Sequence, residues 1–192
     1  MGSSLEQIRL EILNNPGLEK EVRIVAEEIF EKSKQQLIQE FENHPVTKEI
    51  QAGPDASNES GTLGGRGNLF SFIGFNDGAD PIAPIKELLQ GIEFSSSKGR
   101  RFGSGFQFKV NMPDQGELEN VSKMPWETGR SWLYDIERAI SGLGQYLYGQ
   151  FKNSRSGTGM QLEKNFNTNT FMPVKYFGTM LEKFKNKLKG IE

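Results

Sequence analysis

Residues that could carry acid–base, nucleophilic or metal chemistry are few in this sequence. Cysteine is absent and His44 is the one histidine among 192 residues. This composition argues against thiolate or histidine-rich metal sites and against triads that use a histidine base. Serine and threonine are plentiful, but no Gly-x-Ser-x-Gly segment is present to expose a nucleophile. We therefore predict no catalytic residue, no metal ligand and no cofactor.

Carboxylates and amides form two weak candidate groups. The first could offer oxygen ligands to a hard cation: Asn76, Asp77 and Asp80. It lacks the alternating acids, central glycine and distal glutamate of a calcium loop, so a turn followed by a helix cap at Asp80-Pro81 is favoured. The second could in principle supply an acid–base pair: Glu127, Asp135 and Glu137. Nothing in the sequence marks the pKa values of these three carboxyl groups as shifted.

A glycine-rich stretch occupies residues 51–68. Its Gly61-Thr62-Leu63-Gly64-Gly65-Arg66-Gly67 segment could suggest phosphate binding. A phosphate loop, however, follows a strand, ends in Gly-Lys-Ser/Thr and begins a helix, and none of these features is predicted here. We expect a long loop that is mobile in the free protein and ordered by partners.

Basic and aromatic residues are interleaved between residues 98 and 110. They are Lys98, Arg100, Arg101, Phe102, Phe106 and Phe108. Sheets that recognise RNA stack bases on aromatic side chains arranged in this way. A strand whose phenylalanines pack under helices explains the same pattern and is favoured. A nucleic-acid-binding module that uses the strand 98–110 remains the alternative function.

The clearest element is an amphipathic helix predicted over residues 18–43. Its apolar residues recur at steps of three and four: Val22, Val25, Ala26, Ile29, Phe30, Leu37 and Phe41. His44-Pro45 should end this helix because the residue before proline avoids helical dihedrals, and His44 should interact with the last carbonyls. A shorter helix is predicted at 3–14, with Leu5, Ile8 and Ile12 on one face.

The remaining pattern predicts a strand at 69–75, a turn at 76–78, a helix at 81–90, and a hairpin of 92–97 and 101–112 that turns at 97–100. Residues 113–128 look polar and irregular, 129–149 fit a helical face weakened by glycines, and a strand is possible at 159–166. A final helix should begin at Pro173 and bury Val174, Phe177, Met180, Leu181, Phe184 and Leu188. The predicted fold class is α+β: a long N-terminal amphipathic helix packed on a small antiparallel sheet, with a short helix between strands and a C-terminal helix. We expect one domain, 1–192, with a helical arm at 1–17 and the long loop at 51–68.

Charge and hydropathy narrow the class of protein. The formal net charge of −2 argues against a dedicated non-specific DNA binder. No apolar run approaches the length of a membrane span, and the N-terminal residues lack the pattern of a signal peptide. We therefore expect a soluble intracellular or intravirion protein.

The order of elements, with Ser60-Gly61-Thr62-Leu63 in the loop after the long helix, resembles the neck or tail-completion proteins of tailed bacteriophages. The segment from Glu42 to Phe75 is similar to virion proteins of this kind, and the resemblance covers roughly residues 18–112. Residues 113–192 would be an added region.

The resemblance implies a non-enzymatic virion structural protein at the head–tail junction, assembled in the host cytoplasm. It implies a homo-oligomeric ring whose partners are copies of itself, connector or adaptor proteins, and tail terminator or tube proteins. DNA would only pass through the lumen, no membrane would be bound, and the family offers no catalytic residues to carry over.

Overall fold

The computed structural model describes residues 15–65, 67–95, 99–102, 105–125, 127–138 and 172–189. The helix predicted at 3–14, the possible strand at 159–166 and residues 139–149 of the predicted helix lie outside these ranges. Within them the protein is α+β, dominated by helices and completed by short antiparallel strands. The predicted fold class is confirmed.

Helix α2 (Pro16–Asn43) confirms the predicted long helix. The Asn15 side chain accepts the Gly17 N–H at 2.9 Å, and Pro16 opens the first turn, where its missing amide hydrogen costs nothing. Its buried face comprises Ala26, Phe30, Ser33, Leu37 and Phe41. The prediction that Val22, Val25 and Ile29 also face the core is wrong. Val22 and Ile29 are half-buried and Val25 is exposed, because helical geometry turns them to one flank.

His44 separates α2 from a second helix, α3 (Pro45–Gln51), which sequence reasoning did not predict. The His44 backbone is extended, as expected before proline, but its ring caps the following helix by accepting the Val46 N–H at 3.3 Å. The expected interaction with the last carbonyls of α2 is therefore wrong for the side chain. Only the His44 backbone N–H reaches back, to the Phe41 carbonyl.

After a 3₁₀ turn, η1 (Gly53–Asp55), and the loop, residues predicted as a strand form helix α4 (Leu69–Ile73). The Asn68 side chain caps it through the Ser71 N–H at 2.9 Å, and Gly74 ends it in a left-handed conformation at φ 89°. A short apolar run fits either state, and the Asn cap with the terminal Gly decides for the helix.

The hairpin that follows helix α5 (Ala83–Gln90) is confirmed, but its turn was misplaced. Strand β1 (Glu93–Phe94) pairs with β4 (Val110–Asn111), and β2 (Arg100–Phe102) pairs with β3 (Gly105–Gln107), both antiparallel. Arg100 pairs with Gln107 and Phe102 with Gly105, so residues 103–104 connect the strands and the turn does not lie at 97–100.

The second half of the chain is more regular than predicted. Residues 113–128 contain helix α6 (Gln115–Val121), started by a capping box between Asp114 and Glu117, and strand β5 (Lys123–Met124). Strand β6 (Glu127–Ser131) pairs with β5 and leads into helix α7 (Trp132–Asp135), so 129–131 are not helical. Helix α9 (Phe177–Lys189) begins four residues later than predicted.

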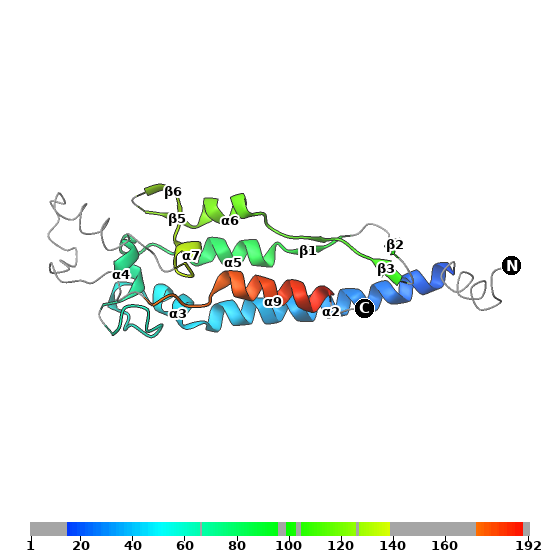
Figure 1. Cartoon of the computed structure of the whole chain (residues 1–192), viewed down its shortest axis with the longest axis horizontal. Helices are drawn as coiled ribbons and strands as arrows, with labels where there is room; N and C mark the ends of the chain where they lie inside the picture. Colours follow the sequence, from blue (N-terminus) through cyan, green and yellow to red (C-terminus); the bar gives the residue numbers. More distant parts are fainter. Residues whose placement is uncertain are drawn as a thin grey trace.

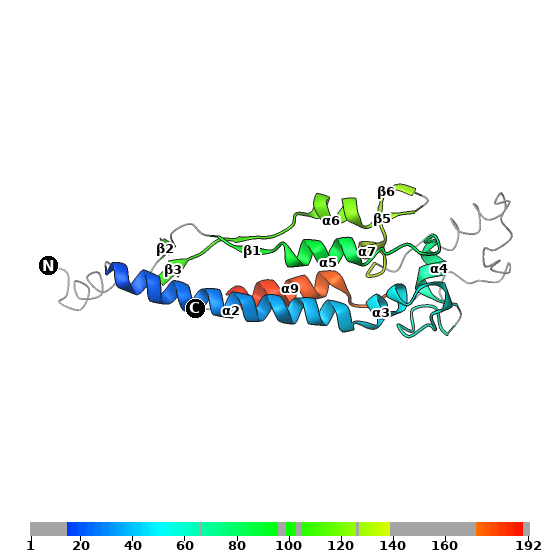
Figure 2. The ribbon, with the colours of Figure 1, turned by 180° about the vertical axis from the view of Figure 1, so that it is seen from behind.

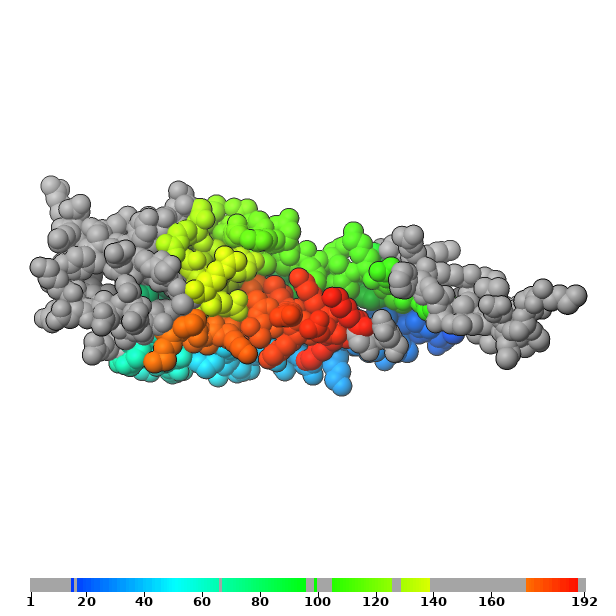
Figure 3. Space-filling model, in the orientation of Figure 1, coloured from blue at the N-terminus to red at the C-terminus, as the bar shows by residue number. Residues whose placement is uncertain are grey.

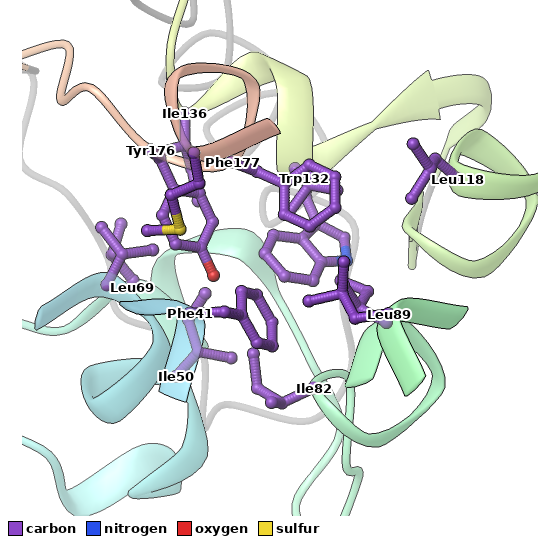
Figure 4. Packing of buried hydrophobic residues seen from close by; sticks show 14 of the residues in the cluster. Phe41, Ile50, Leu69, Ile82, Leu89, Leu118, Trp132, Ile136, Tyr176 and Phe177 are labelled. Carbon is purple, nitrogen blue, oxygen red and sulfur yellow. The ribbon is translucent and has the colours of Figure 1, made fainter. Parts of the chain in front are cut away.

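The elements are arranged in layers along an elongated molecule (Figures 1 and 2). Helix α9 lies antiparallel on the C-terminal half of α2, α5 lies above this pair, and α6 forms the outer layer. On the face shown in Figure 3, α9 and the region from α6 to α7 form neighbouring bands. Aromatic residues fill the core: the Phe41 ring lies 6.1 Å from Tyr176 and 5.9 Å from Phe177. Figure 4 shows Phe41, Ile82, Leu89 and Trp132 converging from different elements.

The two ends of the molecule differ. We call residues 30–51 with α4, α5, α7 and α9 the body. We call residues 16–29 of α2 with strands β1–β4 the arm. In Figures 1 and 2 the arm extends past the C-terminal end of α9, with the hairpin beside α2. None of the described helices is long and apolar enough to cross a membrane.

Candidate functional site

The loop that carries the Ser60–Leu63 motif is built around a buried carboxylate. Glu49 of α3 is fully buried. Its Oε1 accepts the Leu69 N–H at 2.7 Å, and its Oε2 accepts the Ser60 N–H at 2.8 Å. A buried carboxylate is tolerated only when donors surround it, and these hydrogen bonds meet that need. Glu49 therefore fixes both ends of the loop to α3.

Asn58 organises the interior of the same loop. Its amide nitrogen donates to Glu49 Oε1 at 2.9 Å, and its Oδ1 accepts the N–H groups of Leu63 and Gly65, both at 3.1 Å. Thr62 and Leu63 are buried. The chain's own contacts thus organise this loop, which argues against the expectation that only partners order it.

The outer side of the loop is exposed. Its exposed residues, here the loop rim, are Ser57, Glu59, Gly61, Gly64 and Gly65. Gly61, Gly64 and Gly65 have φ values of 68°, 59° and 80°, a region that favours glycine. The glycine cluster therefore serves sharp turns around Asn58, and among its described residues, 61–65 and 67, no helix begins that could bind a phosphate.

The loop is joined to the segment that leads into α9. The Met172 N–H donates to the Thr62 carbonyl at 3.0 Å, and Met172 itself is 59% exposed. Nearby, the buried hydroxyl groups of Thr47 and Tyr176 lie 2.7 Å apart. Burial raises the pKa of the Tyr176 hydroxyl far above its ordinary value. The exposed Met172 is therefore joined through its backbone to the loop at this end of the molecule.

His44 packs beside this junction. Its ring centroid lies 4.8 Å from that of Tyr176, and its Nδ1 is occupied by the Val46 N–H. Partial burial lowers the pKa of His44, opposed by a hydrogen bond with the Lys175 backbone and by the charge of Glu137. The histidine acts as a helix cap and packing residue.

Where the structure describes their side chains, members of the two groups of carboxylates and amides serve backbone hydrogen bonds and an ion pair. Asp80 Oδ1 accepts the N–H groups of Ile82 and Ala83, both at 3.0 Å, as a capping side chain would, but α5 begins at Ala83 with Ile82 in the N-cap position, two residues later than predicted. The Ala79 N–H donates to the Asn76 carbonyl, and Asp77 and Gly78 lie in the turn, as predicted. Among the described residues, no three histidine, aspartate or glutamate side chains are grouped to hold a metal ion.

Two of the candidate acid–base residues have structural roles, one as a helix cap and one in an ion pair. Glu137 Oε1 accepts the N–H groups of Tyr176 and Gly178 at 2.7 and 2.9 Å, and so caps α9 from outside the helix. Asp135 forms an ion pair with Arg130 at 2.7 Å. The side chain of Glu127 lies outside the described residues. Glu137 and Asp135 thus each have their own structural partners.

Two aromatic residues of the hairpin, Phe94 and Phe108, pack together, and Phe94 contacts α2. The Phe94 ring lies 5.4 Å from Phe108 and 5.7 Å from Phe30 of α2, and the guanidinium group of Arg23 lies 5.6 Å from the Phe94 ring centroid. Bases would need exposed aromatic faces to stack upon. This packing favours the structural interpretation of the strand 98–110. The side chains of Arg101 and Phe102 lie outside the described residues.

Sequence reasoning missed Glu49 and Asn58. Glu49 stands between Lys48 and Ile50 and looks like any surface glutamate, while Asn58 sits in a polar loop. The one available signal was the density of Asn, Ser and Thr near several glycines, which is typical of side chains that bond to the backbone. Comparison of the chain with protein-family models, curated proteins and solved structures finds no match.

Proposed function

We propose that this protein is a virion structural protein of the head–tail junction of a tailed bacteriophage. Copies of it would assemble as a ring between connector and tail around the path of the DNA, without a catalytic role. The proposal rests on the resemblance of the segment from Glu42 to Phe75 to neck and tail-completion proteins.

The observation that supports it best is the placement of contact surfaces. The Ser60–Leu63 turn is anchored through Glu49 and Asn58 at one end of the molecule, and the arm extends at the other end (Figure 1). A ring needs subunits that meet through two different surfaces, because head-to-tail contacts close a cycle. The loop rim at one end, in a loop anchored through Glu49 and Asn58, and a projecting helix with a hairpin at the other end meet that need.

The first test is the size of the assembly. Light scattering and native mass spectrometry should give either an oligomer with several times the 21.6 kDa mass of this chain for the protein alone, or, after connector and tail proteins are added, a complex that contains several copies of this chain. A particle that remains at 21.6 kDa under all these conditions would contradict the ring.

The second test separates the rim from the fold. Deleting residues 53–67, a natural choice for a mobile loop, would remove the buried Leu63 and the donors to Glu49, so it would unfold the protein. Glu59→Arg changes one exposed rim residue and should abolish ring formation while it leaves the melting temperature unchanged. Glu87→Arg makes the same charge change on the exposed side of α5 and should leave ring formation and the melting temperature unaltered.

A third test concerns biological joining. Phage that carry Glu59→Arg should accumulate filled heads and separate tails, whereas phage with Glu87→Arg should yield normal virions. Normal virions from both phage variants would contradict the structural role. So would an enzymatic activity that is lost when one residue of this chain is changed.

A further inference from the structure

His44 occupies the junction between α2 and α3, and its ring has a partner on each of two elements. Its Nδ1 accepts the Val46 N–H at 3.3 Å, which makes the side chain the N-cap of α3. Its ring centroid lies 4.8 Å from that of Tyr176, in the segment that leads into α9. The ring therefore connects the start of α3 with the start of α9.

The cap requires one protonation state of the ring. Nδ1 can accept a hydrogen bond only while it carries no proton, so the neutral ring holds its proton on Nε2. A second proton would go to Nδ1, and two N–H groups would then face each other across the contact with Val46. The new positive charge would also lie at the N-terminus of α3, where the helix dipole disfavours cations. Protonation of His44 thus removes the cap.

Helix α3 transmits this loss to the loop. It has only seven residues, and short helices have little stability of their own. Glu49, in its last turn, accepts the N–H groups of Ser60 and Leu69. Helix α3, helix α4 and the loop lie together at the end of the molecule opposite the arm (Figures 1 and 2). A change in α3 therefore moves the carboxylate that fixes the loop.

We propose that His44 is an acid-sensitive switch of the loop rim: protonation of its ring uncaps α3 and loosens the loop, while α2 and α9 keep their packing. The contact of Phe30 with Phe184, which joins α2 to α9, does not involve α3. The switch is a property of the single chain, so it does not depend on the proposed ring of subunits.

Groups on several elements set the pH at which the switch acts. Burial has the largest influence and lowers the pKa of His44, and the charge of Lys183 on α9 acts in the same direction. The Lys175 backbone, Glu137 beyond α7 and Glu40 on α2 favour the charged ring and are outweighed. The ring is therefore uncharged at neutral pH, and the switch acts below pH 6.5.

Two other neighbours of the ring do not titrate in this range. Helix α3 presents the backbone N–H of Val46, and the Tyr176 hydroxyl stays protonated because burial raises its pKa. Neither group can replace His44 as the one that responds to acid.

NMR of the ring nitrogens tests the protonation states directly, because His44 is the one histidine of the chain. At neutral pH the spectrum should show a proton on Nε2 and none on Nδ1. A proton on Nδ1 at neutral pH would overturn the inference, since this nitrogen could not then accept the Val46 N–H.

Hydrogen exchange of the unmodified protein between about pH 7.5 and pH 5.5, where a histidine titrates, tests the release of the loop. Relative to the intrinsic rate at each pH, the Ser60 and Leu69 amides should exchange roughly fivefold faster in acid, as expected from the loss of an N-cap. Exchange in α9 should be unchanged. Constant protection of Ser60 and Leu69 while His44 titrates would overturn the inference, and so would an equal loss of protection in α9.

Two variants distinguish His44 from the carboxylates of the chain. His44→Asn keeps an acceptor for the Val46 N–H and does not titrate, so protection of the loop should not change over this pH range. Lys183→Gln removes a charge that disfavours the charged ring, so the titration of His44 and the loosening of the loop should both move to higher pH. Lys185→Gln is the matched control, because it makes the same change at another exposed position of α9 and should move neither.

Two results with these variants would contradict the switch. One is a loosening of the loop in acid that persists in His44→Asn, which would assign it to a carboxylate. The other is a loosening that stays at the same pH in Lys183→Gln while the titration of His44 moves.

Discussion

The body and the arm share helix α2, yet the apolar residues of its two halves differ in burial. In the body, Phe30, Leu37 and Phe41 are at most 3% exposed beneath α5 and α9. In the arm, Val22 and Ile29 are half-buried and Val25 is exposed. Polar bonds join this half of α2 to the distant hairpin region: Arg23 donates to the Ser95 carbonyl at 3.0 Å, and Glu19 accepts the Gly99 N–H at 2.9 Å.

The difference shows that amphipathic spacing specifies a helix but not its burial. The same three- and four-residue steps run through both halves of α2, so local sequence alone would assign both to the core. Burial depends on which other segments reach each half. Substitutions in the body should therefore cost far more stability than substitutions in the arm, and four variants test this.

The largest effect should come from Phe41→Ala in the body. Phe41 is fully buried and contacts both Tyr176 and Phe177. Removing the ring leaves a cavity at the centre of the core, so we expect a loss of about 3–5 kcal/mol in the free energy of unfolding. Urea denaturation followed by circular dichroism measures this loss. A loss smaller than that of the arm variant Arg23→Ala would contradict the conclusion that the body contributes more to stability than the arm.

Glu49→Gln should have the next largest effect. The amide keeps one oxygen acceptor, but its NH₂ group would face the N–H of Ser60 or of Leu69, or the Asn58 amide. One buried donor would lose its acceptor, which costs about 1–3 kcal/mol. Hydrogen exchange should show faster exchange at the Ser60 and Leu69 amides, and unchanged exchange at both would disprove the role given to Glu49.

The pH dependence of the body should arise in part from His44. Its pKa is lowered from 6.5 in the folded state by burial, so neutral His44 contributes stability that is complete above pH 6.5 and is lost as the pH falls. Burial, the largest influence, and the charge of Lys183 lower the pKa of His44, and together they outweigh the Lys175 backbone, Glu137 and Glu40, which favour the charged ring.

His44→Asn isolates this contribution. Asparagine keeps an acceptor for the Val46 N–H and does not titrate. The stability advantage of the wild type over the variant should shrink as the pH falls below 6.5. Thermal melts of both proteins across this pH range measure the stability difference. If the advantage of the wild type grew on acidification, the pKa of His44 would be raised by folding, not lowered.

The smallest effect should come from Arg23→Ala in the arm. This change removes the bond to the Ser95 carbonyl, the ion pair with Glu27 and the contact with the Phe94 ring. The pair is partly exposed, so we expect about 1 kcal/mol or less. The consequence should be local, with faster amide exchange in β1 and β4 and no change in α9.

Particular residues explain how far the sequence could predict the structure. Long, strongly periodic segments such as α2 were predicted well, and so were elements with distinct caps, such as α5 behind Asp80. Short runs were not, because Leu69–Ile73 fits a strand as well as a single helical turn until Asn68 caps it.

The candidate site was harder to predict because its bonds join distant parts of the chain. Glu49 and Leu69 are twenty residues apart, and Thr47 and Tyr176 are 129 residues apart. No local spacing connects such pairs, so the anchoring of the loop was not foreseeable. Only the presence of the loop could be predicted from its glycines.

The cap that Glu137 places on α9 has a consequence for how this chain can change during evolution. The Val174 N–H donates to the Ile136 carbonyl, and the Tyr176 N–H donates to Glu137, so the chain leaves the body and returns to it at neighbouring points. Closing a loop whose two ends are already held together depends only weakly on its length. Doubling the number of residues costs about 0.6 kcal/mol. Residues 138 and 172 are thus held close together by bonds between described residues, and a change of length between them would leave the cap on the first turn of α9 in place.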